Sequence, residues 1–75
     1  MLKKNVLIYG QVQGVGFRYW VKGKLKEMGL EGEAWNNEDK TVEAWFEGEK
    51  RAVEQMIKLC HEGPPLAKVK KVVIL

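Results

Sequence analysis

Residues 10 to 18, GQVQGVGFR, combine three glycines with one of the chain's only two arginines. Gly14 and Gly16 permit a positive φ and let a ligand approach the backbone without meeting a Cβ atom. Backbone N–H groups in such a turn, together with the start of a following helix, can bind an anion. Arg18 adds a planar guanidinium that can hold two phosphate oxygens at once. The segment therefore predicts a phosphate-binding loop, with an ordinary strand-to-helix turn as the alternative.

The segments on either side of this loop are expected to be a strand and a helix. The apolar run NVLIY, residues 5 to 9, is typical of a strand that is central in its sheet and buried on both faces. Five apolar residues recur at helical spacing between residues 17 and 28, and Gly29 stands where a left-handed C-terminal residue is expected. The loop would then join a central strand to the N-terminus of an amphipathic helix.

Residues 31 to 47 alternate in the manner of a β-hairpin. Ala34 and Ala44 fall on the face that is predicted to meet the helices, and Trp35 and Trp45 fall on the opposite face. Tryptophans on an open face can serve a partner, or they can be covered by long neighbouring side chains. Packing is the slightly favoured interpretation.

The register of this hairpin predicts its loop. Pairing Ala34 with Ala44 requires a connection of odd length, which indicates a three-residue loop at residues 38 to 40. Lys40 would then occupy the left-handed position where glycine is usual, at a cost of about 1 kcal/mol.

A second helix is expected from Glu49 to Cys60, and a last strand within AKVKKVVIL, so that the element order is β-α-β-β-α-β. With right-handed crossovers, this order predicts a ferredoxin-like α+β sandwich: an antiparallel sheet of order 4-1-3-2 with two helices on one face. Residues 1–75 are interpreted as a single domain, because no linker or repeat appears. The fold alone does not name a function.

Composition narrows the classes of function. Hydrophobic residues make up 45% and charged residues 31% of the chain, as in soluble globular proteins. The one cysteine, Cys60, excludes an intramolecular disulfide, and no Cys/His cluster could hold zinc, so no cofactor is expected. The net charge of +3 comes from dispersed lysines, which argues against a nucleic-acid partner. The N-terminal apolar run is too short for a secretory or membrane segment, so a cytoplasmic location is expected.

The stretch GQVQGVGFR resembles the signature loop of the acylphosphatases, a family of small ferredoxin-like hydrolases. The resemblance extends over nearly the whole chain: GLEGEAWNNEDKTVEAWFEGE lies where the family's second signature falls, and GPPLAKV follows the second helix. The second signature departs from the family pattern at Glu33, Trp35 and Lys40, which bears on substrate affinity and local stability more than on chemistry. The sequence stops soon after the fourth strand, where family members continue into a fifth, and the exposed sheet edge allows a homodimer.

The resemblance implies an enzyme that hydrolyses the carboxyl-phosphate bond of small acyl phosphates and releases inorganic phosphate, without a metal or a covalent intermediate. It implies that Arg18 binds the phosphate and that Asn36 positions the attacking water. The implied phosphate-binding loop consists of the backbone N–H groups of Gln13, Gly14, Val15, Gly16 and Phe17. A phosphate- or anion-binding module of the same fold, without turnover, is the alternative. A third interpretation, an RNA-binding protein that stacks bases on Trp35 and Trp45, is less favoured.

Overall fold

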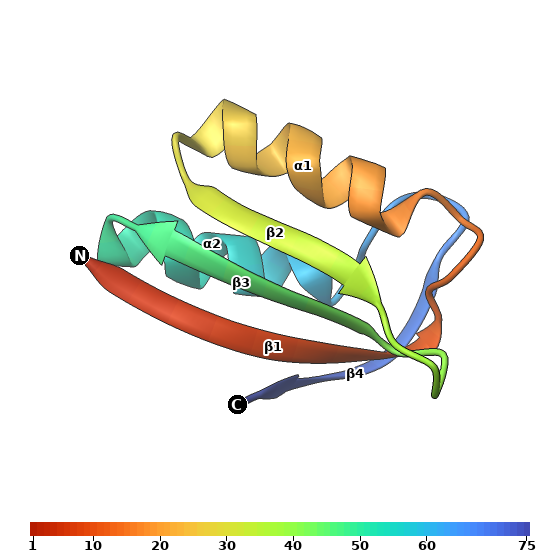
Figure 1. Ribbon diagram of the computed structural model, residues 1–75. Coiled ribbons are helices and arrows are strands. Elements are labelled where there is room, and N and C mark those ends of the chain that lie inside the picture. Colours follow the sequence, from red (N-terminus) through yellow and green to blue (C-terminus); the bar gives the residue numbers. More distant parts are fainter.

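The computed structural model describes all 75 residues and has the predicted order of elements. They are β1 (Leu2–Gln11), α1 (Phe17–Met28), β2 (Glu31–Asn36), β3 (Val42–Gly48), α2 (Lys50–Cys60) and β4 (Lys68–Ile74). The strands form one antiparallel sheet in the order β2-β3-β1-β4, which is the predicted order counted from the other edge. Both helices lie on one face of this sheet (Figure 1). The ferredoxin-like α+β fold is confirmed.

The core fills the space between the two helices and the sheet. Val6 and Ile8 of β1, and Ala44 and Phe46 of β3, are fully buried. The helices contribute one apolar stripe each: Phe17, Val21 and Leu25 from α1, and Val53, Met56 and Cys60 from α2. Burial of these stripes against the sheet is the main force that holds the helices in place. Neither helix is long and apolar enough to cross a membrane.

Strand β1 is longer than the predicted segment and is fully buried on only one face. Val6 and Ile8 are buried beneath the helices, whereas Leu7 and Tyr9 are partly exposed on the open face. The prediction of two buried faces was wrong because neighbouring long side chains, not helices, cover the second face. The ammonium of Lys71, for example, lies 4.6 Å from the centroid of the Tyr9 ring. The central position of β1 is confirmed, because it pairs with both β3 and β4.

The open face of the sheet carries its tryptophans in partly covered positions. The ammonium of Lys3 lies 4.6 Å from the centroid of the Trp45 ring. This cation lies where a nucleic-acid base would compete for the ring. Glu43 and Glu47 alternate with Trp45 along β3 and are partly exposed on the same face, where they would repel phosphates. This arrangement favours packing over the RNA-binding interpretation.

The hairpin between β2 and β3 has the predicted register and the predicted loop. The N–H group of Asn37 donates to the carbonyl oxygen of Thr41 at 2.9 Å, and that of Lys40 donates to the oxygen of Asn37 at 3.1 Å. These bonds close a three-residue loop at residues 38–40. Lys40 has a φ of 73° and is the one non-glycine residue with a positive φ.

We expect Lys40→Gly to raise the free energy of unfolding by about 0.5 to 1 kcal/mol, because glycine adopts the left-handed conformation without strain. The gain is smaller than the strain itself, since glycine also makes the unfolded chain more flexible. Urea unfolding monitored by tryptophan fluorescence would measure the change. Glu38→Gly is the matched control, because residue 38 lies in the same loop without a positive φ and should give no gain.

Candidate active site

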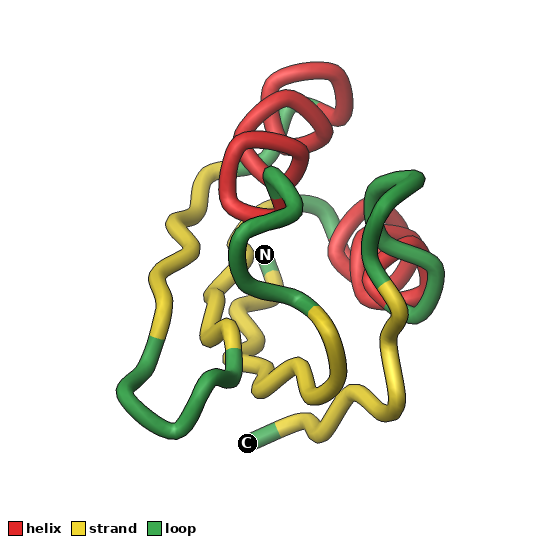
Figure 2. Tube along the Cα trace, turned by 90° about the vertical axis from the view of Figure 1, so that its right-hand side faces the viewer, coloured by secondary structure: helices red, strands yellow, loops and turns green.

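Three connections gather at one end of the molecule: residues 12–16 between β1 and α1, residues 37–41 of the hairpin, and residues 61–67 between α2 and β4 (Figures 1 and 2). The last of these passes so close to α1 that a Cβ atom on Gly63 would lie 2.7 Å from the ring of Phe17. That ring also packs edge-on against Trp20, with the centroids 5.3 Å apart. The first turn of α1 is thereby anchored in the core, whereas Arg18, the next residue, is exposed.

The loop before α1 turns through two glycines in the left-handed conformation. Gly14 has a φ of 75° and Gly16 a φ of 78°. A Cβ atom at either position would meet nothing within 4 Å, so the backbone borders open space there. Gly16 is the N-cap of α1, and this helix start has neither a side-chain cap nor an acidic residue in its first turn. The positive end of the helix dipole is therefore left without a negative partner from the chain.

The backbone N–H groups of residues 13–16 are not used in holding the fold together. None of them donates to another backbone group, and the first bond at this end of α1 runs from the N–H group of Trp20 to the oxygen of Gly16 at 2.9 Å. N–H groups left free at a helix start are available to a ligand, and together with the helix dipole they can bind an anion.

A hollow of about 150 Å³ lies between this loop, the start of α1 and the end of β2. Its lining residues are Val12, Gly14, Gly16, Phe17, Arg18, Tyr19 and Asn36. The fold thus brings Arg18 of α1 and Asn36 of β2 to one hollow. Tyr19, which is 85% exposed, was not predicted to belong to it. The signal was present in the sequence, because Tyr19 is an aromatic residue outside the apolar stripe of its helix.

Two residues of the predicted phosphate-binding loop, Gln13 and Val15, are not among the residues that line the hollow. Val15 packs against the core. The side-chain amide of Gln13 donates from Nε2 to the backbone oxygens of Asn37 at 2.9 Å and Thr41 at 3.0 Å. The prediction concerned only the backbone of Gln13 and did not include this contact. The side chain ties the loop to the hairpin at the residue that directly follows Asn36.

A polar network at the hairpin tip holds the end of β2. Asn37 donates from Nδ2 to Oγ1 of Thr41 and to Oε1 of Glu43, each at 3.1 Å. Thr41, which is buried, donates from its hydroxyl and its backbone N–H group to Oδ1 of Asp39. The hydrogen bond from that hydroxyl lowers the pKa of Asp39, because it stabilises the carboxylate form. The network fixes the strand end that carries Asn36.

The hollow contains one ionisable side chain that is charged at neutral pH, the guanidinium of Arg18, and no histidine, cysteine or carboxylate lines it. His61 is the C-cap of α2. Burial raises the pKa of the Cys60 thiol to about 12, so the thiol stays neutral and acts as an apolar core residue. No cluster of three or more His, Cys, Asp or Glu side chains is arranged to hold a metal ion. The hollow is therefore cationic and rich in hydrogen-bond donors, a combination suited to a phosphate group.

Comparisons with known proteins point to the same chemistry. The acylphosphatase family model matches residues 4–74. The acylphosphatase of Trichormus variabilis is 43% identical over 74 residues, which cover 99% of this chain and 73% of that protein. The acylphosphatase of Thermococcus kodakarensis is 44% identical over 71 residues, covering 95% and 78%. The crystal structure of acylphosphatase from Bacillus subtilis superposes with a TM-score of 0.95 at 33% identity, covering 100% of this chain and 83% of that one.

Proposed function

Because the chain belongs to the acylphosphatase family, we propose that the hollow between the β1–α1 loop and β2 is its active site. The activity is hydrolysis of the carboxyl-phosphate bond of acyl phosphates, giving a carboxylate and inorganic phosphate. The observation that carries the proposed site is that Arg18, Asn36 and a loop with unpaired N–H groups border one hollow. Catalysis is favoured over anion binding without turnover, because the curated relatives are enzymes.

In this proposal the phosphoryl group binds at the loop. The N–H groups of residues 13–17 and the N-terminus of α1 donate to its oxygens, and the guanidinium of Arg18 holds two of them with parallel bonds. The distribution of negative charge over these oxygens shifts during the reaction, because one bond to phosphorus forms while another breaks. Donors that are already fixed in position stabilise the transition state without the reorganisation that water would need.

Asn36 is proposed to position the attacking water. Its side-chain oxygen can accept a hydrogen bond from the water while its Nδ2 group donates to a phosphoryl oxygen. The water oxygen forms a bond to phosphorus on the side opposite the acyl oxygen, and the bond from phosphorus to that oxygen breaks with its electron pair. One proton of the water stays on the phosphate formed, and the other passes to solvent. Holding the water in line with the breaking bond supplies much of the rate enhancement.

The leaving group explains why the hollow needs no general acid or base. Carboxylic acids have pKa values of about 4, so a carboxylate leaves without being protonated. A general acid contributes most when the leaving group is strongly basic, as an alkoxide is. The lining of the hollow agrees with this chemistry, because it holds no carboxylate, histidine or cysteine beside Arg18.

We expect the protein to hydrolyse acetyl phosphate at the same rate with and without EDTA, and to leave phenyl phosphate intact. The acyl phosphate has a good leaving group, whereas phenolate, with a conjugate-acid pKa of about 10, would need assistance that the hollow does not offer. Release of inorganic phosphate is the measurement. Folded protein that binds phosphate but does not turn over acetyl phosphate would support the binding-module alternative, and loss of activity in EDTA would overturn the metal-independent mechanism.

The remaining assignments are proposals as well. A cytoplasmic location fits the single cysteine, Cys60, which is unpaired and buried. Residues 1–75 form a single acylphosphatase-like domain in this proposal. A homodimer through an open edge of the sheet, which is bounded by β2 and β4, remains a prediction. At the β4 edge, the exposed lysines Lys68, Lys70 and Lys71 oppose pairing of two copies, because their charges repel.

A further inference from the structure

The hollow has room for a phosphoryl group and little else. Its volume of about 150 Å³ is below the range of about 300 to 1,000 Å³ for sites that enclose a whole small molecule. The side chains of Arg18 and Asn36 are exposed, and Tyr19 is 85% exposed. A group that leaves from a bound phosphorus therefore stays at the rim, in contact with water. The hollow sets few steric conditions on that group.

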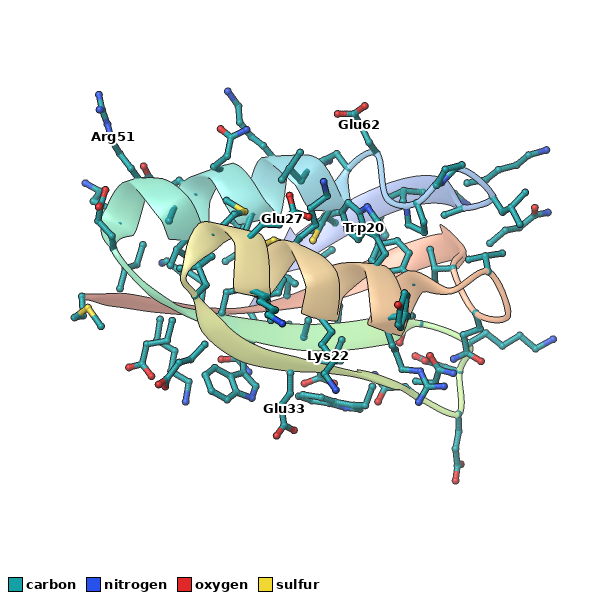
Figure 3. All side chains as sticks on the ribbon, turned by 90° about the horizontal axis from the view of Figure 1, so that it is seen from above. Trp20, Lys22, Glu27, Glu33, Arg51 and Glu62 are labelled. Atoms are coloured by element: carbon teal, nitrogen blue, oxygen red, sulfur yellow. The ribbon has the colours of Figure 1, made fainter.

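The hollow also lacks a side chain suited to protonate a leaving group. Arg18 and Tyr19 are the only titratable residues that line it, and neither is a carboxylic acid or an imidazole. His61 and Glu62 lie in the connection between α2 and β4 at the same end of the molecule, but they do not line the hollow. Glu62 projects beyond α2, on the side away from α1 (Figure 3). A substrate must therefore have a leaving group that departs without help from the protein.

This chemical condition is not specific to acyl phosphates. The pKa of the conjugate acid is about 4 for a carboxylate, about 6.5 for imidazole and about 10 for phenolate. When a phosphoryl group sits on one nitrogen of a protonated imidazole ring, cleavage of the P–N bond releases neutral imidazole. The other ring nitrogen already carries the proton that the leaving group needs. Phosphoryl-imidazoles, the chemical class that includes phosphohistidine, thus meet the same condition as acyl phosphates.

Tyr19 is suited to a leaving group of this kind. It lines the hollow beside Arg18 and is exposed to solvent. The face of an aromatic ring attracts a cation, and a protonated imidazole is a flat cation that can lie against such a face. The guanidinium of Arg18 repels this ring only weakly, because the phosphoryl group lies between the two and the rim is open to water.

We propose that the hollow also hydrolyses phosphoryl-imidazoles, with Tyr19 holding the protonated ring at the rim. The proposal rests on the proposed function, because Arg18, Asn36 and the loop keep the same roles. The water oxygen forms a bond to phosphorus on the side opposite the ring nitrogen. The P–N bond breaks, its electron pair stays on that nitrogen, and neutral imidazole leaves. One proton of the water stays on the phosphate formed, and the other passes to solvent.

The first test needs no variant and follows phosphate release from phosphoimidazole between pH 6 and pH 9, with the uncatalysed rate subtracted. The substrate loses its ring proton at a pH of about 6.5 to 7, and above that pH it must expel imidazolate, a strong base. We expect kcat/KM to fall about tenfold per pH unit above pH 7, because no side chain of the hollow replaces the lost proton. The value for acetyl phosphate should not follow this fall.

Phenyl phosphate provides the second comparison. At pH 6, kcat/KM for phosphoimidazole should exceed that for phenyl phosphate by about 10³-fold, in line with a difference of about 3.5 in the pKa of the leaving group. Arg18→Ala should lower the turnover of phosphoimidazole and acetyl phosphate by similar factors, because the two phosphoryl groups bind the same donors.

Tyr19→Leu tests the aromatic contact. We expect kcat/KM for phosphoimidazole to fall about two- to fivefold more than kcat/KM for acetyl phosphate, the scale of one exposed cation–π contact. Tyr9→Leu is the matched control, because Tyr9 is the only other tyrosine and lies on the open face of the sheet, beside Lys71. Its ratio of the two values should equal the wild-type ratio. An equal fall for both substrates in folded Tyr19→Leu would overturn the role of Tyr19.

Each outcome decides between the two proposals. If acetyl phosphate is hydrolysed but phosphoimidazole reacts no faster than phenyl phosphate, the second activity is overturned and the proposed function stands. A phosphoimidazole rate that stays constant from pH 7 to pH 9 would mean that a protein group protonates the ring, which would overturn the proposed mechanism of that activity. Phosphoimidazole turnover that survives in Arg18→Ala would place the activity outside the hollow. If neither substrate is hydrolysed, both proposals fail together.

Discussion

Replacing Arg18 with alanine is expected to lower kcat/KM for acetyl phosphate by about 10³-fold or more. Loss of a single fixed donor to a developing negative charge costs about 10² to 10³ in rate, and Arg18 supplies two donors together with the only positive charge of the hollow. Arg18→Lys keeps the charge but loses the parallel pair of bonds, so an intermediate loss of about 10²-fold is expected. Steady-state kinetics measured as phosphate release would give both values.

Arg51 provides the matched control for this experiment. It is the only other arginine in the chain, it is also exposed in the first turn of a helix, and it projects from α2 away from the site (Figure 3). Arg51→Ala should retain wild-type kcat/KM. If the two alanine variants lost similar activity, or if Arg18→Ala remained active, Arg18 would not be the phosphate-binding group.

Replacing Asn36 with alanine is expected to lower kcat by about 10² to 10³-fold and to change KM by less than about threefold. In the proposed mechanism, the Asn36 amide contacts the water and a phosphoryl oxygen in the transition state, whereas the ground-state phosphate is held mainly by Arg18 and the loop. A loss confined to kcat indicates an interaction made in the transition state. The side chain of Asn36 is exposed and takes no part in the hydrogen bonds that hold the hairpin tip, so stability should change little.

The control for Asn36 is Asn5→Ala. Asn5 lies on β1 opposite Trp45, on the sheet face that points away from the helices and the hollow. This variant should keep wild-type kcat. If kcat were unchanged in Asn36→Ala, the water would be positioned by another group. If KM instead rose by the factor expected for the fall in kcat, Asn36 would be assigned to substrate binding.

Much of the fold could be predicted because local signals and global packing agree. The apolar stripe and Gly29 gave α1 its observed bounds, Phe17–Met28. The alternation of small and aromatic residues in the hairpin predicted its register and the positive φ of Lys40. In each case, contacts between residues that are close in the sequence, within a helix or between two adjacent strands, are enough to determine the local structure.

The parts that could not be predicted depend on contacts between distant segments. Nothing near Gln13 in the sequence indicates that its side chain reaches the backbone of Asn37 and Thr41. A depression between α1 and β2 likewise depends on the packing of the helix against Gly32 and Ala34, which appear in the sequence only as small residues of a strand. The full length of β1 was missed because Lys3 and Lys4 extend the strand beyond its apolar run.

The central position of β1 also limits how early the chain can fold during its synthesis. Val6 pairs with Ala44 on one side and with Ile74 on the other. The second of these contacts joins opposite ends of the described chain, and such non-local pairs form slowly because a long loop must close first. During synthesis on a ribosome, the edge of β1 that pairs with β4 therefore stays open until β4 has been made. Until then this edge can pair with other chains. The lysines at positions 3 and 4 reduce that hazard, because charged residues on an open strand discourage aggregation.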